Sequence, residues 1–491
     1  MRSFDVTVLG GGPAGAAAAR MLALWGHRVL LLTRPPRGPA LAESLTPSCG
    51  KLLERIGVLD AINRAGFVRS TGHTVRWGNT DPRVERFGAG ERGWQLLSDD
   101  LDRVLLRQAQ LAGAKVHRHA NVRRVAQDKE GPWRVSYQEH DALRHAESQW
   151  VIDCTGRSAL MSRAHSGRVV VRPRTMAIVG VWERRPRWNL DNDSHTYVES
   201  YPGGWAWSVP VSPIRRQVTV MVVPSSTHVA QRRRLPFTYR NELSGTSMIR
   251  AMIERARPIG SPWARDASSY SCALPWRRRL LIAGDSASFV DPLSSFGVKK
   301  ALASGWLAAV VAHSVLADAT IEAAAMDLFA ARERAMVSGL RRQLGELARE
   351  AASAHPVGFW GNRAGPDVLE GGGDPDVVAL RSDASVVAAY EVMRNAAVLQ
   401  LRAAPGVKRL QRPVVDGHSV VLRDHFVVSA FPEGIRYLRN VDLIALAALA
   451  PEYSEVPALH GAYCTRFGGA LIADVLGALA VMVGKGILHL A

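Results

Sequence analysis

The sequence has 491 residues, of which 47% are hydrophobic and 22% are charged, and its formal net charge is +18. This composition is typical of a globular protein with about two to four domains, and it excludes a fibrous or disordered chain. The four cysteines show no CxxC spacing, so neither a metal site nor a disulfide framework is predicted. The dispersed cysteines fit a reducing, cytoplasmic compartment. The sequence shows no uninterrupted apolar run of roughly 18 residues and no secretory signal, so we expect no integral membrane segment.

The chain begins with a strand, a glycine-rich turn, a helix and a second strand. Asp5–Leu9 and Arg28–Thr33 are apolar and rich in strand formers, whereas Ala16–Trp25 consists of helix formers. The turn between them has the spacing GxGxxG, in which the glycines allow a tight turn, approach of a pyrophosphate and close helix packing. The sequence therefore predicts a βαβ unit that binds a dinucleotide through Gly10, Gly12, Pro13, Ala14 and Gly15.

The second strand ends without the acidic residue that usually binds the ribose hydroxyls. Thr33 stands there instead, and Arg34 follows it. Thr33 can accept one hydrogen bond, and Arg34 could contact adenine or phosphate. We therefore expect both residues to bind the cofactor, in a weaker or different arrangement.

Hydrophobic patterning divides the rest of the chain into helix-rich and strand-rich parts. It predicts helices at Lys51–Ala65 and Asp99–Ala112, an antiparallel sheet containing Thr175–Trp182, Trp205–Val211 and Gln217–Val223, and a helix at Val298–Leu316. Further helices are expected at Ile321–Ala354, Ala384–Leu401 and Leu438–Leu449, with a loop at Gly365–Asp376. The predicted domains are a nucleotide-binding domain in two parts (1–170 and 276–364), a sheet domain (171–275), and a linker with a helical C-terminal region (365–491).

Three further segments resemble FAD-dependent aromatic monooxygenases and flavin-dependent halogenases. Asp153–Ser158 resembles their D-x-T-G-R-S element, Gly284–Ala287 resembles their G-D-(A/S)-A element, and Asp291–Val298 resembles the loop along the flavin pyrimidine edge. The resemblance spans residue 4 to about 330. It implies FAD as cofactor, with Asp285 on the ribityl chain and Pro292, Gly297 and Val298 beside the flavin. It also implies an α/β fold: a glutathione-reductase-like Rossmann FAD domain, an antiparallel-sheet substrate domain and a helical C-terminal region.

Two segments are similar to flavin halogenases in particular. Glu43–Pro47 resembles their loop beside the flavin, which places Ser44 at the cofactor and Lys51 where tryptophan halogenases keep a reactive lysine. Trp205 and Trp207 stand in a segment like their W-x-W-x-I-P element. A solvated Lys51 and two core tryptophans remain open alternatives, as does an aromatic substrate wall, because a spacing of two places both rings on one face of a strand. Glu43 or Lys51 could act as acid, base or positioning charge.

The loop beside the flavin instead favours oxygen transfer. Ser294 stands where tryptophan halogenases have a glutamate, and Phe296 replaces a small hydroxyl residue at the expected halide site. A phenyl ring offers no polar donor to a halide. The resemblance thus implies a monooxygenase in which reduced FAD and O2 form a C4a-hydroperoxide that hydroxylates an electron-rich aromatic ring. The electrons would come from NAD(P)H or a partner flavin reductase.

The substrate prediction also rests on resemblance. The segment Ser288–Gly305 resembles, together with the basic net charge and the additional helical tail, flavoproteins that mature quinone cofactors of bacterial amine oxidases and dehydrogenases. These include one that hydroxylates a peptidyl Trp for tryptophylquinone biogenesis. This implies an acidic polypeptide substrate, docked with help from Lys299, Lys300 and the C-terminal tail. The alternatives are a halogenase, a small-molecule hydroxylase, and a reductase-type or non-catalytic flavoprotein. No nucleic-acid-binding motif is recognised.

Overall fold

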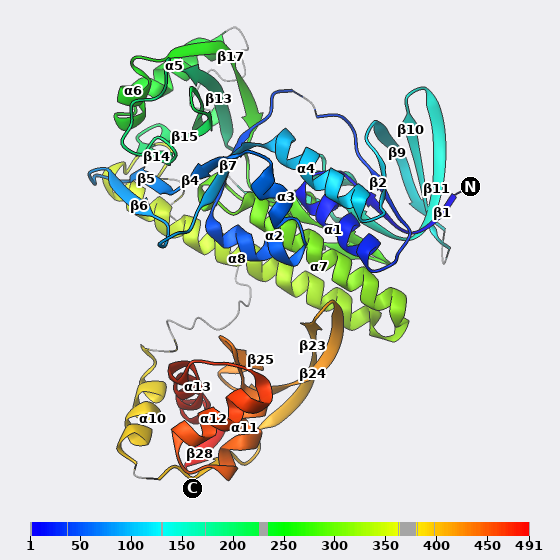
Figure 1. The fold of residues 1–491 in the computed structure, drawn as a ribbon, viewed down its shortest axis with the longest axis vertical. Helices are drawn as coiled ribbons and strands as arrows, with labels where there is room; N and C mark the ends of the chain where they lie inside the picture. Colours follow the sequence, from blue (N-terminus) through cyan, green and yellow to red (C-terminus); the bar gives the residue numbers. More distant parts are fainter. Residues whose placement is uncertain are drawn as a thin grey trace. The chain divides into compact units, whose positions relative to one another are not determined.

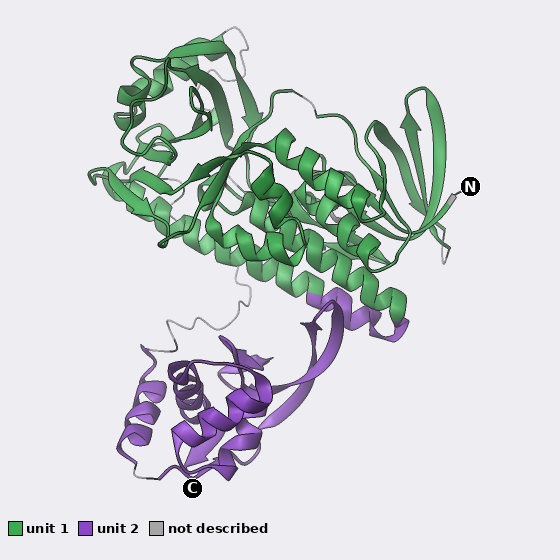
Figure 2. Ribbon diagram, viewed as in Figure 1, with its two compact units in different colours: residues 1–317, 329–371 green, residues 318–328, 372–491 purple. Residues whose placement is uncertain are grey.

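A computed structural model describes residues 2–36, 38–128, 131–171, 173–224, 234–361, 363, 380, 382–396 and 398–490. The chain divides into two compact units (Figure 2), of which the first comprises 1–317 and 329–371 and the second comprises 318–328 and 372–491. The predicted loop at Gly365–Asp376 lies outside the described residues.

The first unit is built on the predicted βαβ element, which is confirmed. Strand β1 (Arg2–Leu9) lies between β2 (Val29–Leu32) and β11 (Ala142–Asp153) and is parallel to both. All four residues of β2 are buried, as expected for a parallel strand covered on both faces. The sheet has eight strands in the order β19-β20-β11-β1-β2-β8, with β10 and β9 continuing from β11. The remaining bounds are Lys115–His117 for β8, Ala120–Gln127 for β9, Trp133–Glu139 for β10, Trp276–Arg277 for β19 and Leu280–Ile282 for β20.

Three helices pack together beside this sheet (Figure 1): α1 (Pro13–Leu24), α4 (Ser98–Leu111) and α7 (Gly297–Ala317). A Cβ atom on Gly305 of α7 would lie 2.1 Å from the carbonyl oxygen of Ala14, so this close approach of the two helices requires glycine. Helix α7 is long and apolar enough to cross a membrane, but 72% of its apolar window is buried inside the structure. Helix α7 is therefore a core helix of the first unit.

The predicted antiparallel sheet is present and has seven strands in the order β17-β13-β16-β15-β14-β5-β6. The bounds are Arg257–Asp266 for β17, Met176–Glu183 for β13, Arg215–Val222 for β16, Gly204–Ser212 for β15 and Thr196–Tyr201 for β14. Strands β5 (Gly72–Arg76) and β6 (Arg83–Arg86) extend the sheet, and β5 is parallel to β14. The sheet therefore takes residues from within the segment 1–170 as well as from 171–275.

Alternating side chains give this sheet two apolar faces. Ile178, Val218 and Val220 face a core that includes α5 (Leu235–Ser244) and α6 (Met248–Ile253). Their neighbours along the strands, including Val179 and Met221, face a second core that is rich in tryptophan. The second core also includes Ala348 and Ala351 of α8 (Glu322–Ala354) and side chains of the loop beside the predicted flavin site.

The predicted helix Lys51–Ala65 is interrupted, which corrects the sequence-based expectation. The structure has two short helices, α2 (Gly50–Arg55) and α3 (Leu59–Arg64). Gly57 between them has a φ of +68°, in the left-handed region that ends helices. Ile56 and Val58 on either side are buried, so the break turns both side chains into the core.

The second unit contains the predicted helices and also strands that were not predicted. Helix α10 (Ala384–Asn395) ends before Leu401, and α11 (Leu443–Leu449) begins after Asp442, whose carboxylate caps it. Between them lies a sheet of β23 (Lys408–Asp416), β24 (Ser419–Val428) and β25 (Phe431–Ile435). Helices α12 (Val456–Phe467) and α13 (Ile472–Gly484) complete the unit; they are bent by 104° to each other and are apolar enough to cross a membrane only when taken together.

Candidate functional site: a cofactor pocket and an aromatic cluster

The glycine-rich turn has the close contacts that a nucleotide-binding turn requires. A Cβ on Gly10 would lie 2.2 Å from the carbonyl oxygen of Cys154, and one on Gly15 would lie 1.9 Å from that of Gly10. Gly12 differs, because its Cβ would meet nothing closer than Asp102 Oδ1 at 3.9 Å and would project into open space. Pro13 and Ala14 open α1, whose first turn holds no acidic side chain. The open space at Gly12 fits a pyrophosphate held at the positive end of α1.

A cavity of about 680 Å³ adjoins this turn. Four of the predicted cofactor residues line it: Gly10, Gly12, Thr33 and Arg34. The cavity also takes in the D-x-T-G-R-S element from Cys154 to Ser158, together with Asp102. The structure thus brings together two segments that lie far apart in the sequence.

The end of the cavity where the ribose is expected is rich in cations. Nη2 of Arg34 donates to Ser158 Oγ at 2.5 Å, which ties the second strand to the D-x-T-G-R-S element. Arg118 and Arg265 also line the cavity, and neither was predicted from the sequence. No motif marks them, since one follows β8 and the other lies near the end of β17. Thr33 packs against Gly11, where a Cβ would lie 2.8 Å from the threonine Oγ1.

Asp153 joins two halves of the cofactor site. Its Oδ1 accepts hydrogen bonds from Thr155 Oγ1 at 2.7 Å and from Ser286 Oγ at 3.1 Å, and its Oδ2 accepts from the backbone N–H of Met161 at 2.7 Å. Asp153 is fully buried. The carboxylate therefore fixes the D-x-T-G-R-S element against the G-D-S-A element.

Asp285 forms an ion pair with the buried side chain of Lys300. The Nζ of Lys300 lies 3.3 Å from Asp285 Oδ1 and donates to the carbonyl oxygen of Ser288 at 2.6 Å. The side chain of Lys300 is only 2% exposed. The expectation that Lys300 helps to dock a polypeptide is therefore wrong, because its ammonium group is buried in an ion pair. Lys299 is partly exposed, so its docking role stays a prediction.

Glu43 lies close to the same cofactor element. Burial, reinforced by the negative charges of Asp285 and Asp102, raises the pKa of the Glu43 carboxyl to about 8. Burial also raises the pKa of Asp102 to about 7, with Asp99 contributing. Glu43 therefore holds a proton near neutral pH and can donate a hydrogen bond.

The strand that carries Glu43 and Ser44 is fixed by the neighbouring sheet. This strand is β3 (Ala42–Leu45). The Oγ of Ser44 accepts a hydrogen bond from Thr196 Oγ1 at 3.0 Å, and the backbone N–H of Ala42 donates to Gln217 Oε1 at 2.6 Å. Gln217 belongs to β16, so the seven-stranded sheet positions the segment with Glu43 directly.

The loop from Asp291 to Gly297 leads into α7. Pro292 follows Asp291, whose carboxylate accepts from the backbone N–H of Leu293, while Gly297 and Val298 open the helix. The first amides of a helix have no acceptor within it and are available to a ligand. Arg363 lies 3.2 Å from Asp291 and also reaches Thr175. Arg363 was not predicted from the sequence, because it lies in no recognised motif.

Trp205 and Trp207 stack on each other, with ring centroids 4.4 Å apart and planes 22° apart, so the prediction of a shared face is confirmed. Trp205 is buried and Trp207 is partly buried. Both belong to the tryptophan-rich core, whose further aromatic members are Trp77, Trp263, Phe289, Phe359 and Trp360. Phe289 and Leu293 come from the loop beside the flavin element, so the aromatic cluster extends to that loop.

The side chain of Lys51 makes no polar contact with the other predicted site residues that the structure describes. Its side chain is exposed on the first turn of α2, and among the described residues no hydrogen bond or ion pair holds its ammonium group. Lys299 lies closer to the loop, with its Nζ 4.9 Å from the ring centroid of Phe296 and 3.2 Å from Ser48 Oγ. The structure thus favours the solvated alternative for Lys51, whose catalytic role stays a prediction.

No group of three or more His, Cys, Asp or Glu side chains suited to a metal ion is found within the described ranges. All four cysteines are free.

Residues 3–316 match the family model described as "FAD binding domain". The chain belongs to this family. FAD is accordingly its cofactor, and the open cradle at Gly12 and the cavity beside it are where the nucleotide part fits. The resemblance proposed from the D-x-T-G-R-S and G-D-S-A elements is therefore confirmed at the level of the family.

Curated relatives of this flavoprotein include halogenases and an oxidoreductase. A tryptophan 2-halogenase of Chondromyces crocatus is 26% identical over 345 residues, covering 67% of this chain and 64% of the relative. The match thus spans just under two thirds of that relative. A putative FAD-dependent oxidoreductase, LodB, of Marinomonas mediterranea is 26% identical over 315 residues, covering 62% of this chain and 83% of the relative.

Solved structures confirm the fold class. The flavin-dependent halogenase CmlS matches with a TM-score of 0.79 and 19% identity, covering 99% of this chain and 96% of that one. The peptidyl tryptophan dihydroxylase QhpG matches with a TM-score of 0.67 and 19% identity, covering 99% of both chains. The fold of the whole chain, including the second unit, is thus shared with both kinds of flavoprotein.

Proposed function

We propose that this flavoprotein is a monooxygenase that hydroxylates an electron-rich aromatic ring, and that the ring is a tryptophan side chain within a polypeptide. The observation that carries the proposal is the aromatic cluster around Trp205 and Trp207, which reaches the loop beside the flavin through Phe289 and Leu293. Trp205 is buried behind the partly buried ring of Trp207, so a substrate indole would pack against the Trp207 side of the cluster. The full-length fold similarity to a peptidyl tryptophan dihydroxylase and the tryptophan 2-halogenase relative support the same substrate class.

When bound and reduced, FAD supplies activation of O2 for transfer of oxygen to the ring. The chain holds the cofactor with Gly12 and the start of α1, with Arg34, and with Asp285 supported by Lys300. Glu43, protonated near neutral pH, can donate a hydrogen bond or a proton beside the cofactor.

The residues at two positions near the flavin support oxygen transfer over halogen transfer. Phe296 occupies the position where a small hydroxyl residue is expected in tryptophan halogenases, and Lys51 is exposed to solvent. A desolvated halide needs polar donors, which a phenyl ring does not supply.

Halogenation is the second candidate, because one observation favours it. The Nζ of Lys299 lies 4.9 Å from the Phe296 ring centroid, so a cation is present beside the proposed halide position. In this candidate function Lys299, rather than Lys51, is the lysine near the flavin loop.

We propose further that the protein works in the cytoplasm, with an acidic polypeptide as substrate and NAD(P)H or a partner reductase as electron donor. The net charge of +18 and the four free cysteines support an acidic partner and a reducing compartment.

The test is intact-mass spectrometry of acidic, Trp-containing polypeptides incubated with the FAD-loaded protein, a flavin reductase, NADH and O2 in buffer that contains chloride or bromide. A gain of one or two oxygen atoms on Trp is expected. A halogen in place of hydrogen would establish the second candidate. Oxidation only of free phenols or indoles would overturn the polypeptide substrate while leaving the monooxygenase intact.

A further inference from the structure

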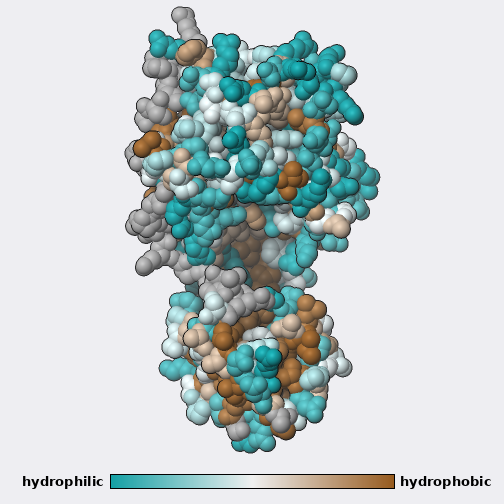
Figure 3. Space-filling view, turned by 90° about the vertical axis from the view of Figure 1, so that its left-hand side faces the viewer, coloured by the Kyte–Doolittle hydropathy of each residue, from teal (hydrophilic) through white to brown (hydrophobic). Residues whose placement is uncertain are grey.

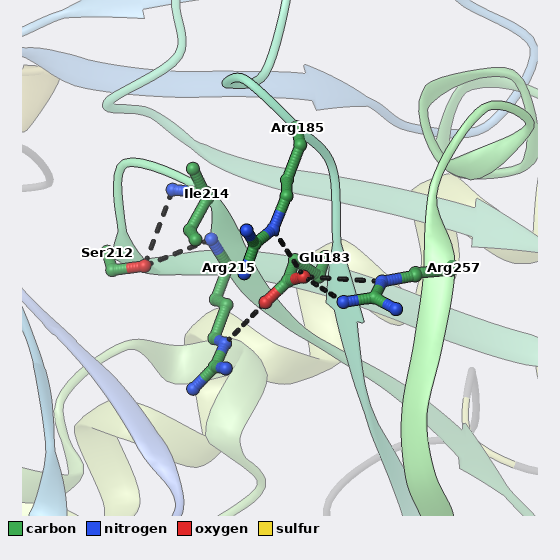
Figure 4. Close-up of polar contacts among 6 residues, drawn as sticks. All are labelled: Glu183, Arg185, Ser212, Ile214, Arg215 and Arg257. Carbon is green, nitrogen blue, oxygen red and sulfur yellow. Dashed lines mark hydrogen bonds and ion pairs between the residues drawn. The ribbon is translucent and has the colours of Figure 1, made fainter.

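Glu183, the last residue of β13, is surrounded by three arginines (Figure 4). Its Oε1 accepts hydrogen bonds from Arg185 Nε at 3.0 Å and Arg257 Nη2 at 2.6 Å, and its Oε2 accepts from Arg215 Nε at 3.0 Å. Three positive groups and one negative group leave this arginine cluster with a net charge of +2.

The sheet register produces the arginine cluster. Glu183 lies directly opposite Arg215 on β16 and directly opposite Arg257 on β17, on its two sides. One arginine would suffice to neutralise a single carboxylate, and each additional cation adds like-charge repulsion. Neutralising Glu183 therefore does not account for all three arginines.

The guanidinium groups are exposed, whereas the carboxylate is not. The side chain of Glu183 is 1% exposed, and those of Arg185, Arg215 and Arg257 are 68%, 50% and 67% exposed. The Nη atoms of Arg185 and Arg215 have no partner in the described part of the chain. Ser212 adds rigidity, because its Oγ accepts from the backbone N–H groups of Ile214 and Arg215 in the preceding turn.

The charge of the arginine cluster is stable to pH. Hydrogen bonds from Arg257, Arg215 and Arg185 lower the pKa of Glu183 to about 2. The carboxylate therefore stays ionised and keeps the three guanidinium groups in place throughout the physiological range.

We propose that Arg185, Arg215 and Arg257, held by Glu183, form a docking site for an acidic segment of a polypeptide partner. Planar guanidinium groups bind carboxylates through paired hydrogen bonds, and groups already fixed by Glu183 lose little freedom on binding. Nucleic acids are bound along basic stripes, whereas these cations converge on one point. The proposal does not depend on the reaction that the flavin performs.

The arginine cluster lies at the far end of β13 from the flavin element. Thr175, just before the first residue of β13, contacts Arg363, which in turn pairs with Asp291 of the flavin loop. The eight residues of β13 extend roughly 26 Å to Glu183. A partner anchored at the arginine cluster therefore leaves the flavin loop uncovered.

The test is fluorescence anisotropy of a labelled peptide of alternating Glu and Ser, titrated with full-length, FAD-loaded protein at low salt. Replacing two arginines, Arg185→Gln with Arg215→Gln, is expected to weaken binding by about tenfold, because Arg257 still neutralises Glu183 while two exposed cations are lost. A matched control, Arg83→Gln with Arg134→Gln, removes the same charge from exposed one-to-one ion pairs elsewhere. The control should change binding by less than about twofold.

Three results would overturn the proposal. Equal weakening by both double variants would show that only net charge matters. Unchanged binding of the Arg185/Arg215 variant, with its thermal unfolding midpoint retained, would exclude the arginine cluster. Tighter binding of a short DNA duplex than of the peptide, lost in the same variant, would assign the site to nucleic acid.

Discussion

Gly12 shows how one missing side chain creates room for a cofactor. Its backbone takes ordinary dihedral angles, φ −74° and ψ −171°, so glycine is not needed there for conformational reasons. It is needed because a side chain would project into the open cradle before α1. The neighbouring Gly10 and Gly15 are instead required by contacts with backbone oxygens.

Gly12→Val should therefore fold but bind FAD roughly a hundredfold more weakly, because its methyl groups occupy the space of the pyrophosphate. Flavin absorbance after purification and titration of the apoprotein with FAD measure this effect. Gly469→Val is the control, since no atom lies within 4 Å of a Cβ at that position. A purified Gly12→Val protein that remains yellow would contradict the assignment of the cradle.

Glu43 couples the stability of the apoprotein to pH. Its pKa is raised from 4.5 to about 8, so the folded protein binds a proton that the unfolded chain has released between these values. The free energy of unfolding must then fall as pH rises through this window, and level off above it.

Glu43→Gln removes this proton uptake and should make the decline in unfolding free energy between about pH 5 and 8 shallower. Urea unfolding of the apoprotein at several pH values measures the slope. Glu54→Gln, at an exposed position on α2, should keep the slope of the unchanged protein. An identical slope for Glu43→Gln would mean that Glu43 ionises normally.

At the scale of elements, Lys300 connects α7 to the segment that carries Asp285. Lys299 and Lys300 are adjacent in sequence, yet one is partly exposed and the other is buried. Helical periodicity could have separated them, since Lys300 shares a face with the buried Ser304, four residues later. The two adjacent lysines were expected to dock a partner together, which wrongly placed Lys300 on the surface.

Lys300→Met should weaken FAD binding by about tenfold, because Asp285 loses its buried ion-pair partner. It should also make the reduction potential of the bound flavin more negative, because a nearby positive charge favours added electrons. Spectroelectrochemistry and FAD titration measure the two effects. Lys485→Met breaks a comparable Lys–Asp pair in the second unit and should leave the flavin potential unchanged.

Local patterns predicted the first βαβ unit and the main strands of the seven-stranded sheet correctly. Strand β5 was not predicted because its partner β14 lies more than 100 residues away, and no local pattern encodes that pairing. Strand β6 pairs with the nearby β5, but all four of its residues are exposed, so no buried alternation marks it. Strands β23 and β24 escaped for another reason: charged residues interrupt their alternation, as in Arg412 and Arg423. The site residues outside motifs depend on other long-range contacts: Arg118 on the pairing of β8 with β2, Arg265 on that of β17 with β13, and Arg363 on Asp291 and Thr175.

At the scale of the whole molecule, the two units have separate hydrophobic cores. The core of the second unit includes Leu443, Leu446, Leu479 and Val475, all fully buried. The residues that line the cofactor cavity all belong to the first unit. Because the cavity lies in the first unit, we expect ligand binding to stabilise that unit selectively. Figure 3 shows that hydrophobic residues of both units also reach the surface on one face.

Thermal unfolding should show two transitions, of which only one shifts upward when FAD is added. Leu446→Ala should lower the unfolding free energy of the second unit by about 2–5 kcal/mol, because buried contacts are lost, and should shift only the FAD-insensitive transition. Leu302→Ala, in α7, is the reciprocal variant and should lower the FAD-sensitive transition. Calorimetry distinguishes these cases, and a single transition shifted by both variants would contradict independent units.

The hydrogen bonds of Asp153 also have a consequence for the order of events during synthesis. Thr155 leaves the ribosome long before Ser286, and the chain between them contains most of the seven-stranded sheet. The cofactor site is therefore completed only when the G-D-S-A element and α7 emerge. We therefore expect capture of the flavin to be a late step in biogenesis, and ribosome-bound chains that stop before residue 285 should bind FAD more weakly than the full chain.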